Sequence, residues 1–114
     1  MKWFVGRFIY AFQGFKVCRE DRSIFLQCIF GFIVIVCGIL FHCSLFEWIL
    51  LVWSIGMVIF AEIINSCIER CVDYISLKRD PRAKKIKDLG ASAVFVISCC
   101  AAITGLYVFI PKIF

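Results

Sequence analysis

Four polar side chains recur at spacings of three and four residues within an apolar part of the chain. They are Glu62, Asn65, Glu69 and Asp73. Each residue of an α-helix turns by about 100°, so all four lie in one stripe on one helix face. Carboxylates on a membrane helix are costly unless they are paired or used, so the stripe predicts a functional site.

Glu62 is the deepest group of this stripe. Residues 48–61 of the same helix are uncharged. A rise of 1.5 Å per residue places Glu62 roughly 15–18 Å from the helix end near Tyr74. A carboxyl group there can serve as a general base or acid, and Asn65 can donate to it or to a substrate oxygen. The competing interpretation is a glutamate that only hydrogen-bonds across helices.

Glu69 and Asp73 lie nearer to water, one helical turn apart, and Asp21 precedes the first apolar segment. Such oxygens suit Mg²⁺, which usually takes one or two carboxylates together with substrate phosphates. The stripe therefore predicts a magnesium site, and pairing of its acids with Arg70 or with nearby lysines is the alternative. On spacing alone, Glu20–Arg22 is a solvated helix flank.

Residues 75–88 are strongly basic, and Pro81 within them predicts a loop rather than a continued helix. Lysines near a membrane surface usually hold anionic headgroups, but beside a carboxylate site they can clamp the phosphates of a nucleotide. No GxxxxGK[ST] or GxGxxG loop is present, and the single histidine excludes a Ser/His/Asp triad. The six basic side chains are Lys78, Arg79, Arg82, Lys84, Lys85 and Lys87.

The composition indicates a membrane protein. Of the 114 residues 63% are apolar, and the mean hydropathy is +0.98, whereas a soluble domain is nearer half apolar. The formal charge of +5 does not predict a nucleic-acid partner, because no basic helix stands free of the apolar segments. The eight cysteines are interpreted as small apolar packing residues rather than as disulfides or a zinc site.

The apolar pattern predicts an all-α integral membrane protein with a single domain, residues 1–114. In residues 2–20 one apolar stripe, Phe4, Phe8, Ala11 and Phe15, faces away from most of the charged side chains, which predicts an amphipathic helix lying on the membrane surface. Uncharged runs then predict three transmembrane helices, at residues 24–42, 46–74 and 89–110.

Basic residues are distributed unevenly between the ends of these spans. Five lie before residue 24 and six lie in residues 75–88, while the connection 42–47 has none. The N-terminus and the 75–88 loop are therefore predicted on the cytoplasmic side of the inner membrane, with the C-terminus outside. His42 is expected to be a loop residue. Three short spans offer little room to bury the polar stripe, so an oligomer is expected.

The stretch AEIINSCIERCVDYISLKRDPRAKKIKDLGASAV resembles the signature of the prokaryotic diacylglycerol kinase/undecaprenol kinase family. The family pattern is E-[IL]-[IL]-N-[ST]-x-I-E-x-x-V-D, followed fourteen residues after its last Asp by the Lys of I-K-D and then by small residues. Positions 62 to 88 match it without a gap, and the resemblance covers nearly the whole chain.

The resemblance implies a homotrimer with composite sites between protomers, which transfers the γ-phosphoryl group of MgATP to a lipid alcohol in the bilayer. It implies that Glu62 is the general base and that Glu69 is a metal ligand. Asp21 would be the second metal ligand, together with Glu69. The family usually has Glu at this position, so Glu20, one residue earlier, is the alternative ligand. Asn65 and Asp73 would position substrate and phosphate. The implied ATP contacts are Tyr10, Asp21, Glu69, Lys87 and Asp88.

Two questions stay open on the sequence. The acceptor is diacylglycerol or undecaprenol, and the segment containing Pro81 resembles the undecaprenol branch. The second hypothesis for function is a small transporter or assembly subunit without enzymatic activity, using Glu62 as a proton or cation site. It explains Glu62 but not the spacing of Lys87 and Asp88 or the basic segment.

Overall fold

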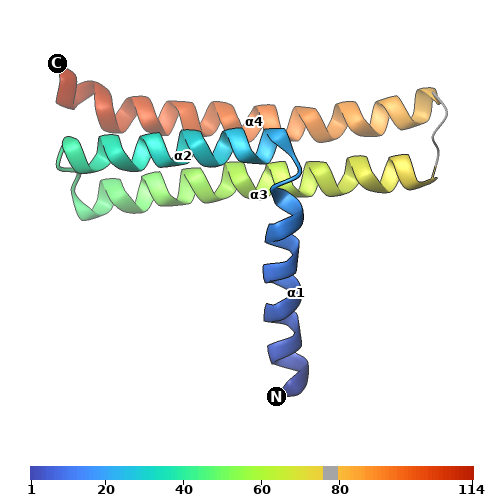
Figure 1. Ribbon diagram of the computed structural model, residues 1–114. Coiled ribbons are helices and arrows are strands. Elements are labelled where there is room, and N and C mark those ends of the chain that lie inside the picture. The colour runs from blue at the N-terminus through green and yellow to red at the C-terminus, as the bar shows by residue number, and fades with distance from the viewer. Residues whose placement is uncertain (76–79) are drawn as a thin grey trace.

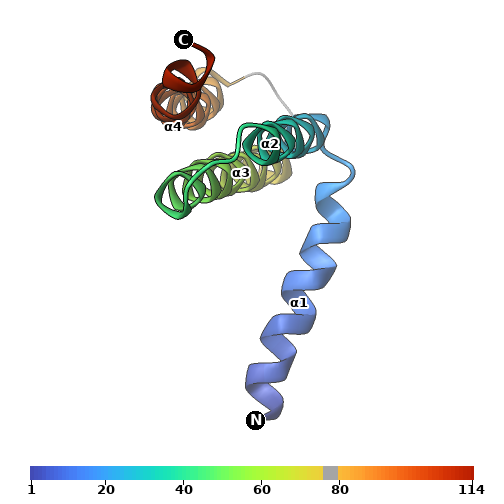
Figure 2. The same ribbon diagram turned by 90° about the vertical axis from the view of Figure 1, so that its left-hand side faces the viewer.

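The computed structural model describes residues 1–75 and 80–114, which form four helices. In chain order they are α1 (Lys2–Cys18), α2 (Arg22–Leu40), α3 (Leu45–Ile75) and α4 (Pro81–Ile113). Helices α2, α3 and α4 lie side by side as a bundle, and α1 projects away from them crosswise (Figure 1). Seen from the end, α3 lies beside both α2 and α4, and its more extensive contacts are with α4 (Figure 2).

Three of these helices are long and apolar enough to cross a membrane. They are α2 with 19 residues, α3 with 31 and α4 with 33. A span of the hydrocarbon core needs about 20 residues, so α3 and α4 are long enough to extend beyond it. The prediction of three spanning helices is confirmed in this sense. The N-terminal helix is present as well, and none of its residues is buried within the described chain.

The predicted loop at residues 75–88 is wrong for its second half, because α4 begins at Pro81. Asp80 is the N-cap of α4, and its carboxylate accepts a hydrogen bond from the Arg82 backbone N–H at 2.8 Å. Proline is favoured at the first helical position, where its missing N–H has no helical partner to lose. Lys78 and Arg79, two of the predicted loop cations, lie outside the described residues.

The predicted end of the third span at Pro111 is also corrected, since α4 continues to Ile113. A proline inside a helix removes one backbone hydrogen bond, but here it lies in the last turn, where few bonds remain to be made. The Phe114 backbone N–H still bonds to the Ile110 carbonyl at 3.0 Å.

Two glycines of α2 lie at its close approach to α3. Gly31 and Gly38 are both buried on α2. A Cβ atom at Gly31 would lie 2.9 Å from Cγ2 of Ile55, and one at Gly38 would lie 2.8 Å from Cη2 of Trp48. Real Cβ contacts are not this short, so larger residues there would force the two helices apart.

The turn between α2 and α3 is held by a reciprocal cap. The Ser44 backbone N–H donates to Oε1 of Glu47 at 2.9 Å, and the Glu47 N–H donates to Oγ of Ser44 at 3.3 Å. Nζ of Lys112 lies 3.0 Å from the same Glu47 carboxylate, so the end of α4 is tied to the start of α3. His42 sits in this turn with φ 53°, which confirms it as a loop residue.

Candidate functional site

The polar stripe predicted on α3 is formed as a helix face. Glu62 is buried, with 8% of its surface exposed. One turn on, Nδ2 of Asn65 donates to Oε1 of Glu69 at 3.3 Å. The polar side chains that interact with the Glu62 carboxyl group are Gln27 of α2 and Glu69 of α3. The most deeply placed acid thus begins a row of polar groups that leads along α3 to its end.

Asn65 has an acceptor atom that the described residues leave unused. Its Oδ1 is buried and has no hydrogen-bond partner among them. This oxygen lies against Gly90 of α4, where an added Cβ would overlap it. Gly90 therefore lets α4 approach α3 closely at Asn65. A buried amide oxygen without a donor is costly, so Asn65 is suited to receive one from a ligand or a bound water.

The start of α4 brings its lysines to the same end of the bundle. Nζ of Lys87 donates to Oδ1 of Asp73 at 2.7 Å, which joins α4 to the end of the stripe. Nζ of Lys84 donates to Oδ2 of Asp88 at 2.8 Å. Just before α4, the side-chain and backbone hydrogen bonds from Arg82 hold the pKa of Asp80 below its ordinary value.

Asp21 meets Arg70 of α3. Nη2 of Arg70 lies 3.3 Å from Oδ2 of Asp21 and 3.6 Å from Oε2 of Glu20. The Asp21 side chain is 28% exposed and that of Glu20 is 68% exposed, so Asp21 is the more enclosed of the two. Arg70 thus pairs with Asp21 rather than with the acids of the stripe, and the predicted partnership of Asp21 with Glu69 stays a prediction.

The acids at this end of the bundle fall into two groups. Asp21, Asp73 and Asp88 each have a basic partner. Within residues 1–75 and 80–114, Glu62 and Glu69 have no ion-pair partner. These two carboxylates are therefore the ones open to a hydroxyl proton or a cation.

The donor atoms fit a magnesium ion only if phosphates complete its shell. In the described part of the chain, no three His, Cys, Asp or Glu side chains come together as a metal cluster. Mg²⁺ is commonly held by one or two carboxylates plus substrate phosphates. The Glu69 carboxylate and the unused Oδ1 of Asn65, on adjacent turns of α3, are oxygen donors of the type that this ion takes.

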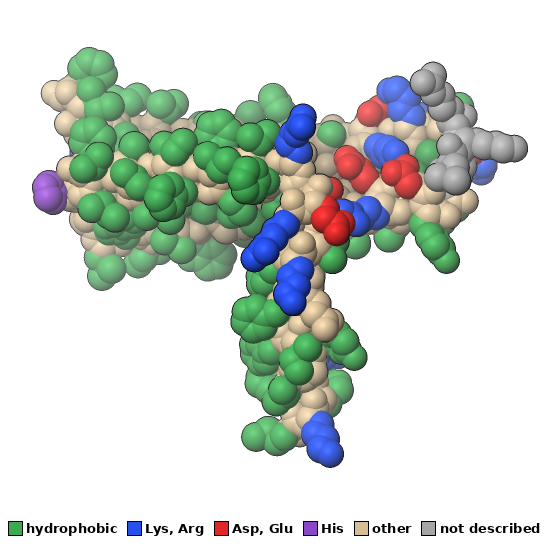
Figure 3. All heavy atoms as spheres, in the orientation of Figure 1, with side chains coloured by type: hydrophobic (Ala, Val, Ile, Leu, Met, Phe, Trp, Pro, Cys, Tyr) green, Lys and Arg blue, Asp and Glu red, His purple; other side chains and the backbone are tan. Residues whose placement is uncertain are grey.

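Tyr10 is a predicted ATP contact that the described residues do not bring to Glu69, Lys87 or Asp88. It lies on α1 with 72% of its surface exposed, in a hollow lined only by other residues of α1. Figure 3 shows acidic and basic side chains gathered where α3 and α4 extend past α1, while the face of the bundle seen there is otherwise mostly hydrophobic.

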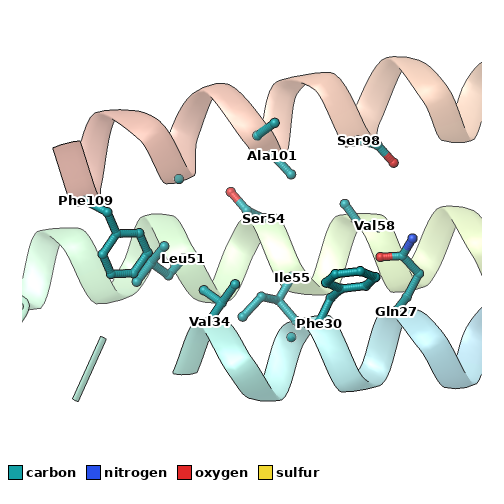
Figure 4. A pocket seen from close by; sticks show the side chains of 13 residues that line it. Gln27, Phe30, Val34, Leu51, Ser54, Ile55, Val58, Ser98, Ala101 and Phe109 are labelled. Atoms are coloured by element: carbon teal, nitrogen blue, oxygen red, sulfur yellow. The ribbon is translucent and has the colours of Figure 1, made fainter. Parts of the chain in front are cut away.

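A partly open pocket between the three long helices was not predicted. It has a volume of about 350 Å³ and lies between α2, α3 and α4 (Figure 4). Its walls are mainly apolar, with Gln27, Ser54 and Ser98 as polar exceptions. The sequence signal that could have indicated this pocket is Gln27, the one strongly polar residue of the first apolar run.

The role of Arg70 as the partner of Asp21 was also not predicted, since the sequence analysis considered Arg70 only as a competing partner of the acids of the stripe.

Together, these features define a small integral-membrane protein with a mixed acidic and basic site at one end of a three-helix bundle. The chain belongs to the prokaryotic diacylglycerol kinase family, whose sequence model matches residues 9–109. It is 34% identical over 111 residues to the undecaprenol kinase of Bacillus subtilis (96% of this chain, 90% of that protein). It is 30% identical over 95 residues to the diacylglycerol kinase of Haemophilus influenzae (82% and 80%). Over 88 residues it is 33% identical to the diacylglycerol kinase of Helicobacter pylori strain J99 (76% and 69%). The resemblance found in the sequence is confirmed.

Proposed function

We propose that this chain is a lipid kinase that transfers the γ-phosphoryl group of ATP to the hydroxyl of a membrane lipid alcohol. The lipid-kinase class follows from the family and from the names of its relatives. The observation that carries the site is the buried Glu62 carboxylate, which has no ion-pair partner among the described residues and stands one turn from Asn65.

The position of the Arg70–Asp21 ion pair indicates how deep in the bilayer the proposed site lies. It lies at the junction where α1 leaves the bundle, so a surface-bound α1 would set Arg70 at the interface. Glu62 is eight residues earlier on α3, roughly 12 Å deeper. Asp73 and Lys87 then lie on the aqueous side. We place this end in the cytoplasm, where ATP is found, and the lipid tails stay in the bilayer.

Glu62 is proposed as the base that takes the proton from the lipid hydroxyl. The reaction requires the hydroxyl oxygen and the γ-phosphorus to be held in line more than it requires covalent help from the protein. Asn65 would position the substrates, because its Oδ1, otherwise unused by the described residues, can accept a hydrogen bond from the lipid hydroxyl. Its Nδ2, which donates to Glu69 in this structure, could donate to a phosphate oxygen instead. Apolar surroundings exclude water, which would compete as the acceptor.

Glu69, with Asp21 after it leaves Arg70, would hold Mg²⁺ together with the phosphates. When bound, the ion neutralises charge on the phosphate oxygens. Lys87 would contact the phosphates, and it is already held in the site by Asp73. Asp88 and Tyr10 complete the proposed nucleotide contacts. Because Tyr10 stands apart from the others in one chain, we propose a homotrimer in which a neighbouring copy supplies it.

Undecaprenol is the acceptor that we favour over diacylglycerol. The undecaprenol kinase of Bacillus subtilis matches 96% of this chain, whereas the Haemophilus diacylglycerol kinase matches 82%. A side-by-side assay in mixed micelles decides the point. Purified protein is given ATP, magnesium and each lipid, and the phosphorylated lipid is measured. Absence of product from both lipids would favour the small transporter or assembly subunit instead.

Glu62→Gln tests the base. This variant should keep the oligomer but lose turnover, whereas Glu47→Gln at the opposite end of α3 should keep turnover while the protein is folded. Size-exclusion chromatography with light scattering checks the assembly of both variants. Full activity of Glu62→Gln would remove Glu62 from the mechanism.

A further inference from the structure

Three thiols from two helices line one pocket between the end of α1 and α3. They are Cys18, the last residue of α1, and Cys67 and Cys71, one turn apart on α3. The pocket has a volume of about 640 Å³, within the usual range of small-molecule sites. Cys67 and Cys71 are exposed and Cys18 is half-buried, so each thiol has accessible surface in the single chain.

The same pocket contains the ion pair that fastens the N-terminal part of the chain to α3. Asp21 and Arg70 both line it, and their closest atoms are 3.3 Å apart. Apart from this pair its wall is largely apolar, with Val17, Ile24 and Ile63 among the lining residues. A group bonded to any of the three thiols would occupy space directly beside Asp21.

α1 is only sparsely attached to the bundle. None of its residues is buried among the described residues, and the substantial helix contacts join α2 to α3 and α3 to α4. An element with few buried contacts is displaced at low cost. A bulky adduct in the pocket can therefore move the end of α1 and break the Arg70–Asp21 pair without unfolding the bundle.

The other five cysteines do not share this setting. Cys28 and Cys37 lie on α2, Cys43 in the turn after it, and Cys99 and Cys100 on α4, and none of them lines this pocket. Interpreting all eight as packing residues does not account for three thiols gathered around one ion pair. Their shared place beside a proposed metal ligand distinguishes these three.

We propose that the pocket between α1 and α3 is a thiol-modification site at which a low-molecular-mass disulfide reversibly switches off phosphoryl transfer. The thiolate of Cys18, Cys67 or Cys71 attacks one sulfur of the disulfide. A new S–S bond forms between the cysteine and that sulfur, while the S–S bond of the small disulfide breaks. The other half of the disulfide leaves as a thiolate and takes up the proton that the cysteine lost, so no further oxidant is needed. The adduct separates α1 from α3 and displaces Asp21. The effect on activity rests on the proposed lipid-kinase function.

The test uses two triple variants that each remove three cysteines. Cys18→Ala/Cys67→Ala/Cys71→Ala lacks the pocket thiols, and Cys28→Ala/Cys99→Ala/Cys100→Ala keeps them. The full chain in lipid vesicles is treated with glutathione disulfide, and intact mass and lipid phosphorylation are followed together. We expect the second variant and the unaltered chain to lose most of their activity as adducts form, and to regain it with dithiothreitol. The first variant should keep its activity.

Equal inactivation of both variants would overturn the proposal, and so would full activity of protein that carries adducts on the pocket thiols. The labelling rates give a test that does not depend on activity. A first glutathionyl group should slow the reaction of the other two pocket thiols, because all three share one space. If untreated protein phosphorylates no lipid, the proposed function fails, and independent labelling of the three thiols would then overturn the pocket itself.

Discussion

Gly90→Ala tests whether the close contact between α4 and Asn65 organises the site. A Cβ at position 90 would overlap Oδ1 of Asn65, so the Asn65 amide must rotate or α4 must move outward. Rotation would break the 3.3 Å bond from Asn65 to Glu69. Overpacking of this kind costs about 1–3 kcal/mol. Replacing glycine by alanine inside a helix returns about 1 kcal/mol. The net expectation is a loss of roughly 0–2 kcal/mol in the free energy of unfolding.

Gly105→Ala on the same helix is the matched control. A Cβ there meets no described atom within 4 Å, so only the helix-propensity gain of about 1 kcal/mol remains. Reversible unfolding in mixed micelles should separate the two variants by about 1–3 kcal/mol. Lipid phosphorylation should fall strongly in Gly90→Ala alone. If Gly90→Ala is as stable and as active as Gly105→Ala, the contact does not position Asn65 and the reasoning is refuted.

Three further outcomes follow from the ion pairs and caps. Lys87→Met should raise the KM for ATP about tenfold, because one charge-assisted contact to the nucleotide is lost. Asp73→Asn should raise the KM less, and equal effects of the two variants would show that the Lys87–Asp73 ion pair is only structural. Glu47→Gln should lower the midpoint of thermal unfolding, and the swap Glu47→Lys/Lys112→Glu should recover part of the loss; no recovery would discount the ion pair. The pKa of Asp80 is lowered by Arg82, so its stabilising effect is complete above its ordinary pKa and is lost as the pH falls through the lowered value. The difference in unfolding midpoint between wild type and Asp80→Asn should therefore shrink below about pH 4, and a constant difference would contradict this assignment.

The apolar runs predicted α2, α3 and most of α4 because uncharged length is a strong local signal. The start of α4 was missed, although Asp80 followed by Pro81 is a readable helix start. An aspartate cap before a proline at the first position stabilises a helix beginning, and this local rule outweighs the general effect of proline as a helix breaker.

The candidate site was only partly readable. Helical spacing alone places Glu62, Asn65 and Glu69 on one face. The unused oxygen of Asn65 depends on where Gly90 of a different helix comes to rest, which no local pattern encodes. Asp21 and its partner Arg70 are 49 residues apart in the sequence. The spacing was equally compatible with Asp21 joining Glu69 at a metal ion, so it could not decide between the two.

The two long helices α3 and α4 are pinned near both of their ends. Lys87 holds Asp73 at one end, and Lys112 holds Glu47 at the other. Sliding one helix past the other by a single turn, about 5.4 Å, would break both pins together. A bilayer whose thickness does not match the helices is therefore accommodated by tilting α3 and α4 together as one rigid pair. The register of α3 against α4, and with it the spacing between Glu62 and Lys87, stays unchanged from one lipid environment to the next.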